Sequence, residues 1–213
     1  MNYKAVIFDL DGVICFTDKY HYLAWKEMAD SMGIYFDETI NNRLRGVSRM
    51  ESLEIILERC DKVLSQDEKQ MLTERKNKTY VELLGQMTEK DLDSEVKETL
   101  DKLRENGLKL AIGSSSKNAK FILERLGLKD YFDAVSDGTN ISQSKPDPEV
   151  FFKAAEFLDI APADCLVVED AKAGIEAAKI GGFDSAGLGE AAACEEVTYA
   201  MHSFRDLIGI ALE

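Results

Sequence analysis

Long apolar runs, closely spaced cysteines and an excess of basic residues are all missing from this sequence of 213 residues. No stretch approaches the roughly 18 continuous apolar residues that span a membrane. The start of the chain lacks the basic and apolar regions of a signal peptide. We therefore expect a cytoplasmic protein that has no membrane partner.

The cysteines and prolines are few and scattered. No two of the four cysteines have the spacing of a metal-ligand pair, which is typical of reduced thiols in a cytoplasm. With only three prolines, the sequence has no long proline-stiffened linker. Any hinge between domains should therefore be short, and we place the hinges near 16–17 and 89–92.

Acidic residues outnumber basic ones by 40 to 26, which gives a formal net charge of -14. An acidic surface disfavours nucleic acid as a partner, because the phosphate backbone is also negative. Any site for a phosphorylated ligand must therefore concentrate positive charge locally.

Apolar segments of strand length recur along the chain. The clearest are residues 5–8, 108–112, 134–135 and 166–168, and weaker ones lie at 185–186 and 197–201. Helical patterns lie between the later segments, and this alternation predicts a doubly wound, Rossmann-like α/β core with a parallel sheet.

The sequence between Cys15 and Asp93 interrupts this alternation. Apolar side chains recur at helical spacing from His21 to Met32, from Met50 to Cys60 and from Tyr80 to Met87, and no convincing strand lies among them. We predict a discontinuous core, residues 1–16 and 90–213, with an all-helical domain inserted at 17–89.

The first apolar segment ends on Asp9-Leu10-Asp11-Gly12. Because side chains alternate along a strand, Asp9 and Asp11 should leave on the same side. The crevice of an open parallel sheet lies beyond the carboxyl ends of its strands. One carboxylate there can act as a nucleophile and the other as a general acid and base. The alternative is that both acids merely cap a loop.

Other polar residues follow the later strands. Ser114 could hold a phosphoryl oxygen, and residues 116–118 should open a helix whose first amides favour an anion. Ser115 is expected to be an ordinary helix cap. Lys145 could balance charge between the carboxylates and a phosphoryl group. Glu169 and Asp170 add oxygen ligands that suit a hard cation.

These motifs carry a resemblance to a known family. "DLDG", Ser114, "KPDP" and "ED", in this order, resemble the four motifs of the haloacid dehalogenase superfamily of phosphotransferases. The resemblance covers the whole chain and implies that the helical insertion is a cap domain. It also implies that Asp9 forms an aspartyl phosphate, that Asp11 is the acid/base, and that Ser114 and Lys145 are catalytic. The implied Mg²⁺ ligands are the carboxylates of Asp9 and Asp170 and the main-chain carbonyl of Asp11, with a contribution from Glu169.

Four further stretches, "TDKYHYLAW", "RGVSRMESL", "RKNKTY" and "SSSKN", are similar to those of the β-phosphoglucomutase family. That family interconverts β-glucose 1-phosphate and β-glucose 6-phosphate through β-glucose 1,6-bisphosphate. A mutase must hold a bisphosphate at both ends and keep water away from the aspartyl phosphate. The implied substrate-binding residues are Thr17, His21, Trp25, Arg45, Gly46, Val47, Arg49, Lys76, Ser114, Ser116, Lys117 and Asn118.

Several of these assignments have a plainer alternative. His21 and Trp25 could be core side chains of an amphipathic helix, and Lys76 could be a solvated lysine. Arg45 stands where the family commonly has lysine, and Phe16 where it commonly has an acid. The alternative function is a sugar-phosphate phosphatase of the same fold, and a non-catalytic phosphosugar sensor is disfavoured because every catalytic position is present. We expect a monomer that acts on a phosphorylated hexose.

Overall fold

Six parallel strands form one sheet in the computed structural model, which describes residues 3–44, 47–60 and 62–212. The order across the sheet is β3-β2-β1-β4-β5-β6. The chain moves from β1 outward to β3, then returns to the other side of β1 for β4, so the sheet is doubly wound and the predicted fold class is confirmed. The strands are β1 (Ala5–Phe8), β2 (Lys109–Gly113), β3 (Ala134–Ser136), β4 (Cys165–Glu169), β5 (Asp184–Gly187) and β6 (Tyr199–Ala200).

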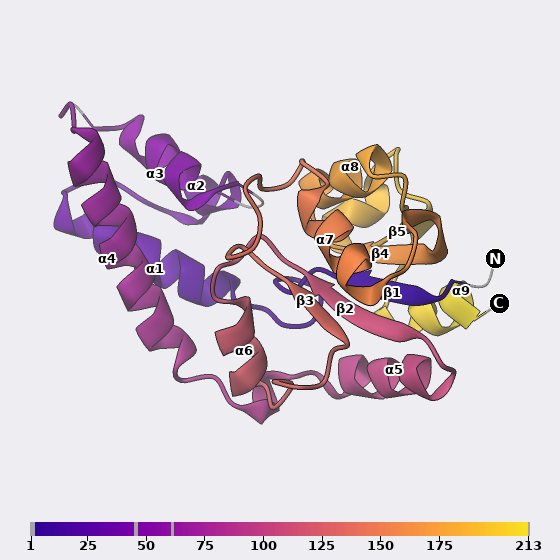
Figure 1. Ribbon diagram of the computed structural model, residues 1–213. Coiled ribbons are helices and arrows are strands. Elements are labelled where there is room, and N and C mark those ends of the chain that lie inside the picture. Colours follow the sequence, from indigo (N-terminus) through magenta and orange to yellow (C-terminus); the bar gives the residue numbers. More distant parts are fainter. Residues whose placement is uncertain (1–2, 45–46, 61, 213) are drawn as a thin grey trace. The chain divides into compact units, whose positions relative to one another are not determined.

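Helices cover both faces of this sheet (Figure 1). One face carries α5 (Ser94–Glu105), α6 (Ala119–Arg125) and α9 (Leu207–Leu212), and the other carries α7 (Glu149–Leu158) and α8 (Lys172–Ile180). Ile7 and Val167 belong to the apolar core that includes Phe151 of α7. Phe8 instead stacks on Phe204, with ring centroids 5.9 Å apart. Because both faces are buried, all four residues of β1 are apolar.

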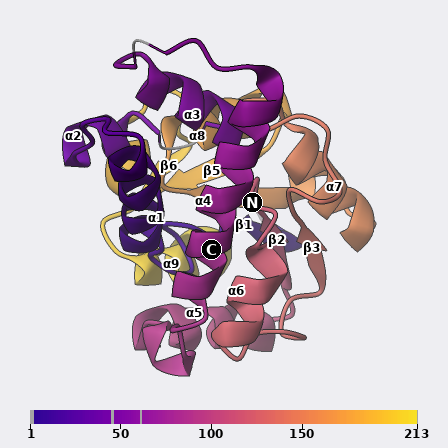
Figure 2. The same cartoon turned by 90° about the vertical axis from the view of Figure 1, so that its left-hand side faces the viewer.

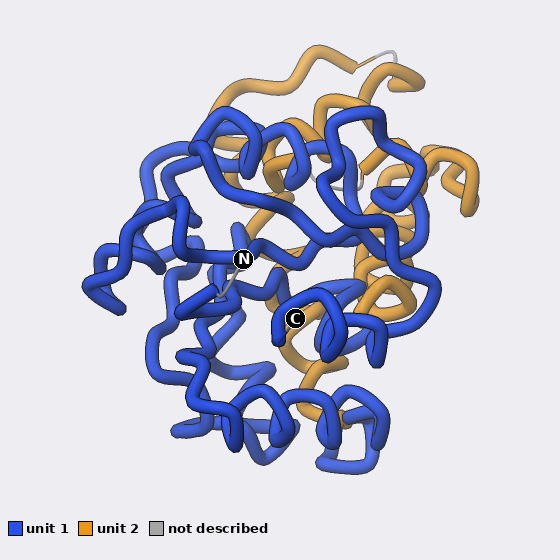
Figure 3. Tube along the Cα trace, turned by 90° about the vertical axis from the view of Figure 1, so that its right-hand side faces the viewer, with its two compact units in different colours: residues 1–16, 88–213 blue, residues 17–87 orange. Residues whose placement is uncertain are grey.

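The chain divides into two compact units, which Figure 3 distinguishes by colour. Unit 1 comprises Met1–Phe16 and Thr88–Glu213 and contains the sheet, and unit 2 comprises Thr17–Met87. The predicted division into domains after residues 16 and 89 stays a prediction.

The described part of unit 2 is helical. Its helices are α1 (Asp18–Ser31), α2 (Glu38–Asn42), α3 (Arg49–Leu57) and α4 (Gln66–Leu84). The helices α1 and α4 pack side by side (Figure 2). A separate apolar core fills this unit, built mainly from Trp25, Met28, Ala29, Ile34, Phe36, Ile40, Leu44, Leu53 and Ile56.

Side-chain caps define where the helices of unit 2 begin. Ser48 and Ser65 each form a reciprocal capping box with the glutamate three residues later, at the start of α3 and of α4. These caps explain why α4 begins at Gln66, well before the apolar stripe from which a third helix was predicted. That helix ends at Leu84, so Met87 lies beyond it.

Short 3-10 turns complete the fold: η1 (Glu89–Asp91), η2 (Pro162–Asp164), η3 (Gly189–Ala193) and η4 (Phe204–Asp206). Among the residues described, no helix combines the length and the apolar character that crossing a membrane requires.

Candidate active site

The register of the sheet brings the polar ends of three strands to one edge. Phe8 pairs with Ile112 on β2 and with Val168 on β4, so Asp9 lies at the level of Gly113 and Glu169, the last residues of those two strands. The amide of Asp9 still donates to the carbonyl of Val168, at 2.9 Å. Beyond β2, the amide of Ser114 donates to the carbonyl of Ser136, at 3.0 Å. The strand ends therefore converge as the motif order predicts for an open parallel sheet.

Lys145 lies between two carboxylates at this edge. Its ammonium donates to Oδ1 of Asp9 and to Oε1 of Glu169, both at 2.5 Å. The side chains of Lys145 and Glu169 are only 6% and 1% exposed. The ammonium also lies 4.7 Å from the ring centroid of Phe151. A buried cation held by two carboxylates and an aromatic ring is fixed in place and largely shielded from water.

Burial and neighbouring charges shift the pKa values of both Asp9 and Lys145. Desolvation raises the pKa of Asp9 well above its usual value, and the charge of Lys145 acts in the opposite direction. Desolvation lowers the pKa of Lys145, but Asp9 and Glu169 outweigh it and raise that pKa. Lys145 is therefore a permanent positive charge beside Asp9.

Three carboxylates at this edge form a candidate cation site. Asp9, Glu169 and Asp170 each offer an oxygen, and these three atoms lie within 4.8 Å of one another. Oxygen donors of this kind suit Mg²⁺, so the residues fit the predicted metal. The second oxygen of Glu169 accepts from the amides of Asp170 and Ala171, at 3.0 and 3.1 Å. These two bonds fix the orientation of the glutamate.

Two glycines make room for the acids. Gly12 has a φ of 92°, and a Cβ there would lie 2.0 Å from Oδ2 of Asp170. On α8, a Cβ at Gly174 would lie 1.9 Å from Oε1 of Glu169. Nothing in the spacing of the "ED" motif predicts this contact between Gly174 and the glutamate.

The loop after β2 is held by its own hydroxyl groups. Oγ of Ser114 accepts from the amide of Ser116, and Oγ of Ser116 accepts from the amide of Asn118, both at 3.2 Å. The helix α6 begins only at Ala119, with Asn118 as its N-cap residue. Ser116 and Lys117 therefore precede the helix, and the prediction that they open it is wrong.

The prediction that Ser115 caps this helix is wrong. Its hydroxyl oxygen is buried and has no hydrogen-bond partner among the residues described. The neighbouring Ser116 supplies the hydroxyl to the turn before α6 instead. Three consecutive serines give no sequence signal that distinguishes which of them faces the turn.

Within unit 2, Lys76 is enclosed by aromatic side chains. It is 2% exposed, and its ammonium lies 4.9 Å from the ring centroid of Trp25 and 4.5 Å from that of Tyr80. The rings of His21 and Tyr80 stack with their centroids 4.0 Å apart. Lys76 is therefore not the solvated lysine of the alternative interpretation. Tyr80 was recognised only as part of an apolar stripe, although it lies four residues after Lys76 on α4, the spacing at which side chains of one helix meet.

Lys76 also fixes the tautomer of His21. Its Nζ lies 2.8 Å from Nδ1 of the imidazole. An ammonium can only donate, so Nδ1 accepts and the proton is on Nε2. Desolvation, together with the charges of Lys76 and Arg49, lowers the pKa of His21 well below its usual value. His21 is therefore a neutral imidazole with one N–H group to donate.

Arg49 is the first residue of α3 and is half-buried. Desolvation lowers its pKa, and no carboxylate in the described parts of the chain forms an ion pair with it. A cation at the positive end of a helix is unfavourable unless an anion joins it. This position therefore suits a site for an anionic group.

The remaining predicted residues are distributed as follows. Thr17 is buried at the start of α1, Val47 is exposed, and Arg45 and Gly46 lie outside the described residues. Asp11 is partly buried beside Gly12, and Lys117 is exposed.

Comparison with known proteins gives consistent matches. The sequence matches the family model of haloacid dehalogenase-like hydrolases over residues 3–182. It is 46% identical, over 88% of this chain and 84% of the relative, to a β-phosphoglucomutase of Bacillus subtilis. It is 33% identical to a phosphorylated carbohydrates phosphatase of Thermotoga maritima, over 85% of this chain and 82% of that protein. A crystal structure of β-phosphoglucomutase from Clostridium difficile superposes with a TM-score of 0.89 at 38% identity, covering 96% of this chain and 93% of that one.

Proposed function

Because the chain belongs to the haloacid dehalogenase-like hydrolase family, we propose that it is a Mg²⁺-dependent β-phosphoglucomutase. It would interconvert β-D-glucose 1-phosphate and β-D-glucose 6-phosphate through β-glucose 1,6-bisphosphate, in the cytoplasm and as a monomer. The observation that carries this proposal is the 46% identity with the Bacillus subtilis β-phosphoglucomutase. The helical insertion, residues 17–89, would serve as its cap domain.

Phosphoryl transfer would take place at the edge of the sheet. Asp9 attacks the phosphorus of the sugar phosphate and becomes an aspartyl phosphate, while Asp11 gives a proton to the departing sugar oxygen. Lys145 would favour the ionised form of Asp9 against the effect of burial and would orient it, since it donates to Oδ1 and leaves Oδ2 for the attack. Ser114 would hold an oxygen of the transferred group. Such catalysis consists mostly of positioning and electrostatic stabilisation.

The predicted Mg²⁺ ligands are the carboxylates of Asp9 and Asp170, the main-chain carbonyl of Asp11, and Glu169 directly or through water. When bound, Mg²⁺ neutralises negative charge on the carboxylates and on the phosphoryl oxygens. Glu169 has a second role in this proposal. It accepts from Lys145, and the same ammonium donates to the nucleophile Asp9.

A mutase needs a second site for the phosphate that is not being transferred. We assign this distal phosphate to Arg49 and to the polar side chains of Ser116, Lys117 and Asn118. The half-buried guanidinium of Arg49 has no carboxylate partner among the described residues, so a phosphate would supply its missing counter-charge. The predicted sugar contacts are Thr17, His21, Trp25, Arg45, Gly46, Val47 and Lys76.

The matching phosphatase of Thermotoga maritima is the reason to retain hydrolysis as the second candidate function. A phosphatase needs one phosphate site and lets water attack the aspartyl phosphate. The distal site is therefore the feature that separates the two candidates.

One assay with two readouts tests the proposal. The protein is given β-glucose 1-phosphate, Mg²⁺ and a trace of β-glucose 1,6-bisphosphate, and glucose 6-phosphate and inorganic phosphate are measured together. We expect glucose 6-phosphate to form much faster than inorganic phosphate, and only from the β-anomer. Phosphate release without glucose 6-phosphate would establish the phosphatase instead.

The assignment of Arg49 to the distal site is tested with a variant in the same assay. Arg49→Ala should lower the mutase rate by at least about tenfold, because a bidentate phosphate contact is lost. Arg59→Ala is the matched control, since it removes an exposed arginine from the same unit. Equal activities of the two variants would contradict the assignment of Arg49.

A further inference from the structure

Two loops lie against each other at the edge of the sheet that carries the candidate active site. β2 and β3 are neighbours in the sheet and Gly113 pairs with Ser136, so the segments that follow these strands leave side by side. The first segment is the loop 114–118, which contains the residues Ser114, Ser116, Lys117 and Asn118 of the proposed phosphate contacts. The second is a turn, residues 137–140, that directly follows β3.

Two backbone hydrogen bonds attach the loop to its neighbour. The amide of Ser114 donates to the carbonyl of Ser136 at 3.0 Å, and the amide of Gly138 donates to the carbonyl of Ser116 at 3.1 Å. The first bond fixes the start of the loop to the end of β3. The second fixes the middle of the loop to the turn, so the position of the turn determines that of Ser116.

Gly138 lets the backbones of the turn and the loop approach closely. A Cβ at this position would lie 2.4 Å from the carbonyl oxygen of Ser115 and 2.8 Å from the amide nitrogen of Lys117. It would also lie 2.9 Å from Cγ of Lys117, so the stem of this lysine passes over the glycine. The φ of Gly138 is outside the left-handed region, so a glycine is needed here for space. An alanine could fit only if the loop 114–118 moved.

The side chain of Asp137 shapes the turn that presents Gly138. It is fully buried, and its Oδ1 accepts from the amide and the hydroxyl of Thr139, at 2.9 and 2.5 Å. The amide of Asp137 donates in turn to Oδ1 of Asn140 at 3.2 Å. Oδ2 of Asp137 lies 3.7 Å from the ammonium of Lys120, whose side chain is 66% exposed, so this ion pair contributes little. Asp137 therefore acts in the turn mainly as a hydrogen-bond acceptor.

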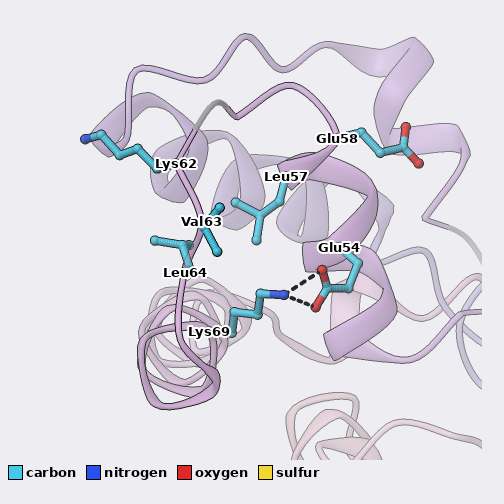
Figure 4. A pocket seen from close by; sticks show the side chains of 7 residues that line it. All are labelled: Glu54, Leu57, Glu58, Lys62, Val63, Leu64 and Lys69. Carbon is cyan, nitrogen blue, oxygen red and sulfur yellow. Dashed lines mark hydrogen bonds and ion pairs between the residues drawn. The ribbon is translucent and has the colours of Figure 1, made fainter.

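The loop that the turn holds carries a charge that a phosphate can use. Lys117 is exposed and forms no ion pair within the parts of the chain that the structure describes. Lys69 of unit 2 is the contrast, shown in Figure 4. It lines a pocket of about 260 Å³ with Leu57 and Leu64, but its ammonium donates to both carboxylate oxygens of Glu54, at 2.7 and 2.9 Å. The charge of Lys69 is thus neutralised within the protein, whereas that of Lys117 is not.

On the basis of the function proposed above, we propose that Asp137 and Gly138 are positioning residues for the phosphate-binding loop 114–118. Asp137 closes the turn, and Gly138 holds the backbone of Ser116 and Lys117 through its amide and through the close contact beside it. Neither residue touches the substrate. Without this support, part of the binding energy would be used to order the loop, so affinity for the phosphosugar falls.

The nucleophile is held independently of the turn. Asp9 accepts from Lys145, and its amide donates to the carbonyl of Val168 on β4. Displacement of the turn should therefore weaken binding and leave the chemical step at Asp9 nearly unchanged.

The test compares four variants by their KM and kcat for β-glucose 1-phosphate. Gly138→Ala inserts the Cβ, Asp137→Ala removes the acceptor from the turn, and Asp137→Asn keeps an acceptor oxygen but removes the charge. Asp133→Ala is the matched control, because Asp133 precedes the other end of β3 and its Oδ2 also accepts from a backbone amide, that of Leu110, at 3.0 Å. Thermal midpoints of all variants are recorded beside the kinetics.

We expect Gly138→Ala and Asp137→Ala to raise KM by about five- to twentyfold with kcat nearly unchanged, as when hydrogen bonds to a charged phosphate are weakened. Asp137→Asn and Asp133→Ala should keep KM close to the wild-type value. A merely structural role would lower the thermal midpoints of Asp133→Ala and Asp137→Ala without separating their KM values.

Two results would overturn the positioning role: a wild-type KM in Gly138→Ala, or equal KM values in Asp137→Ala and Asp133→Ala. Failure of the proposed function has a different signature, because the wild-type protein would then release phosphate without forming glucose 6-phosphate. Ser114 of the same loop would in that case hold the phosphate that is hydrolysed. The KM values for hydrolysis would therefore still decide on the turn, so the two failures are distinguishable.

Discussion

At the scale of single residues, Gly12 must be glycine for two separate reasons. Its φ of 92° is left-handed, and a Cβ would collide with the carboxylate of Asp170. We expect Gly12→Ala to cost about 1–2 kcal/mol in stability from the backbone alone. It should also displace Asp170, so that much more Mg²⁺ is needed for half-maximal activity, and a titration of activity against Mg²⁺ measures this.

Gly107 provides the control that separates the two reasons. Its φ of 85° is nearly the same, but a Cβ there would meet nothing within 4 Å. Gly107→Ala should lose a similar free energy of unfolding and keep the wild-type dependence on Mg²⁺. If both variants need the same Mg²⁺ as the wild-type protein, the contact between Gly12 and Asp170 has no part in cation binding.

At the scale of elements, α8 and α9 each contain a glycine where helix propensity favours alanine. At the exposed position of Gly209 on α9, a Cβ meets nothing within 4 Å, so Gly209→Ala should gain about 0.5–1 kcal/mol in stability. On α8, Gly174→Ala should lose stability, because the buried carboxylate of Glu169 would have to move. That movement would break its bond to Lys145, and overpacking typically costs about 1–3 kcal/mol.

Urea unfolding of these two variants provides the measurement. The prediction requires midpoints that move in opposite directions, with activity lost only in Gly174→Ala. A gain of stability in both would show that Glu169 can move without penalty, and the rigid contact between α8 and the site would then be wrong.

The elements also explain how far the sequence could predict the fold. The strands β1 and β4 were predictable because they are buried on both faces and read as continuous apolar runs. The helix α2 was missed because five residues are too short to display a helical period. Its start depends on the side chain of Asp37, which accepts from the amide of Ile40.

The candidate site was predictable where topology alone determines position. Residues at the carboxyl ends of neighbouring parallel strands, such as Asp9 and Glu169, must meet at one edge of the sheet. The contact of Lys76 with His21 could not be predicted, because it depends on how α1 packs on α4. The close approach of Gly174 to Glu169 likewise depends on a side-chain conformation that spacing does not specify.

At the scale of the whole molecule, the net charge of -14 opposes the assembly of more negative charge at the cation site. Asp9, Glu169 and Asp170 lie together, and Lys145 supplies one positive charge beside them. Any salt will screen the general repulsion of an acidic protein. A bound cation also relieves the local repulsion among the three carboxylates, which general screening does not do, so the two effects must be separated by experiment.

Thermal unfolding in Mg²⁺ and in NaCl of equal ionic strength separates them. A ligand present at a hundred times its Kd stabilises the folded state by about 2.7 kcal/mol, which for a chain of this length raises Tm by roughly 5–10 °C. We expect a rise of this size that saturates with Mg²⁺, and a smaller, gradual rise with NaCl. Asp170→Asn should respond alike to both salts. A Mg²⁺ effect that survives this substitution would place the cation elsewhere, because removing one of three ligands from a shared site must weaken binding there.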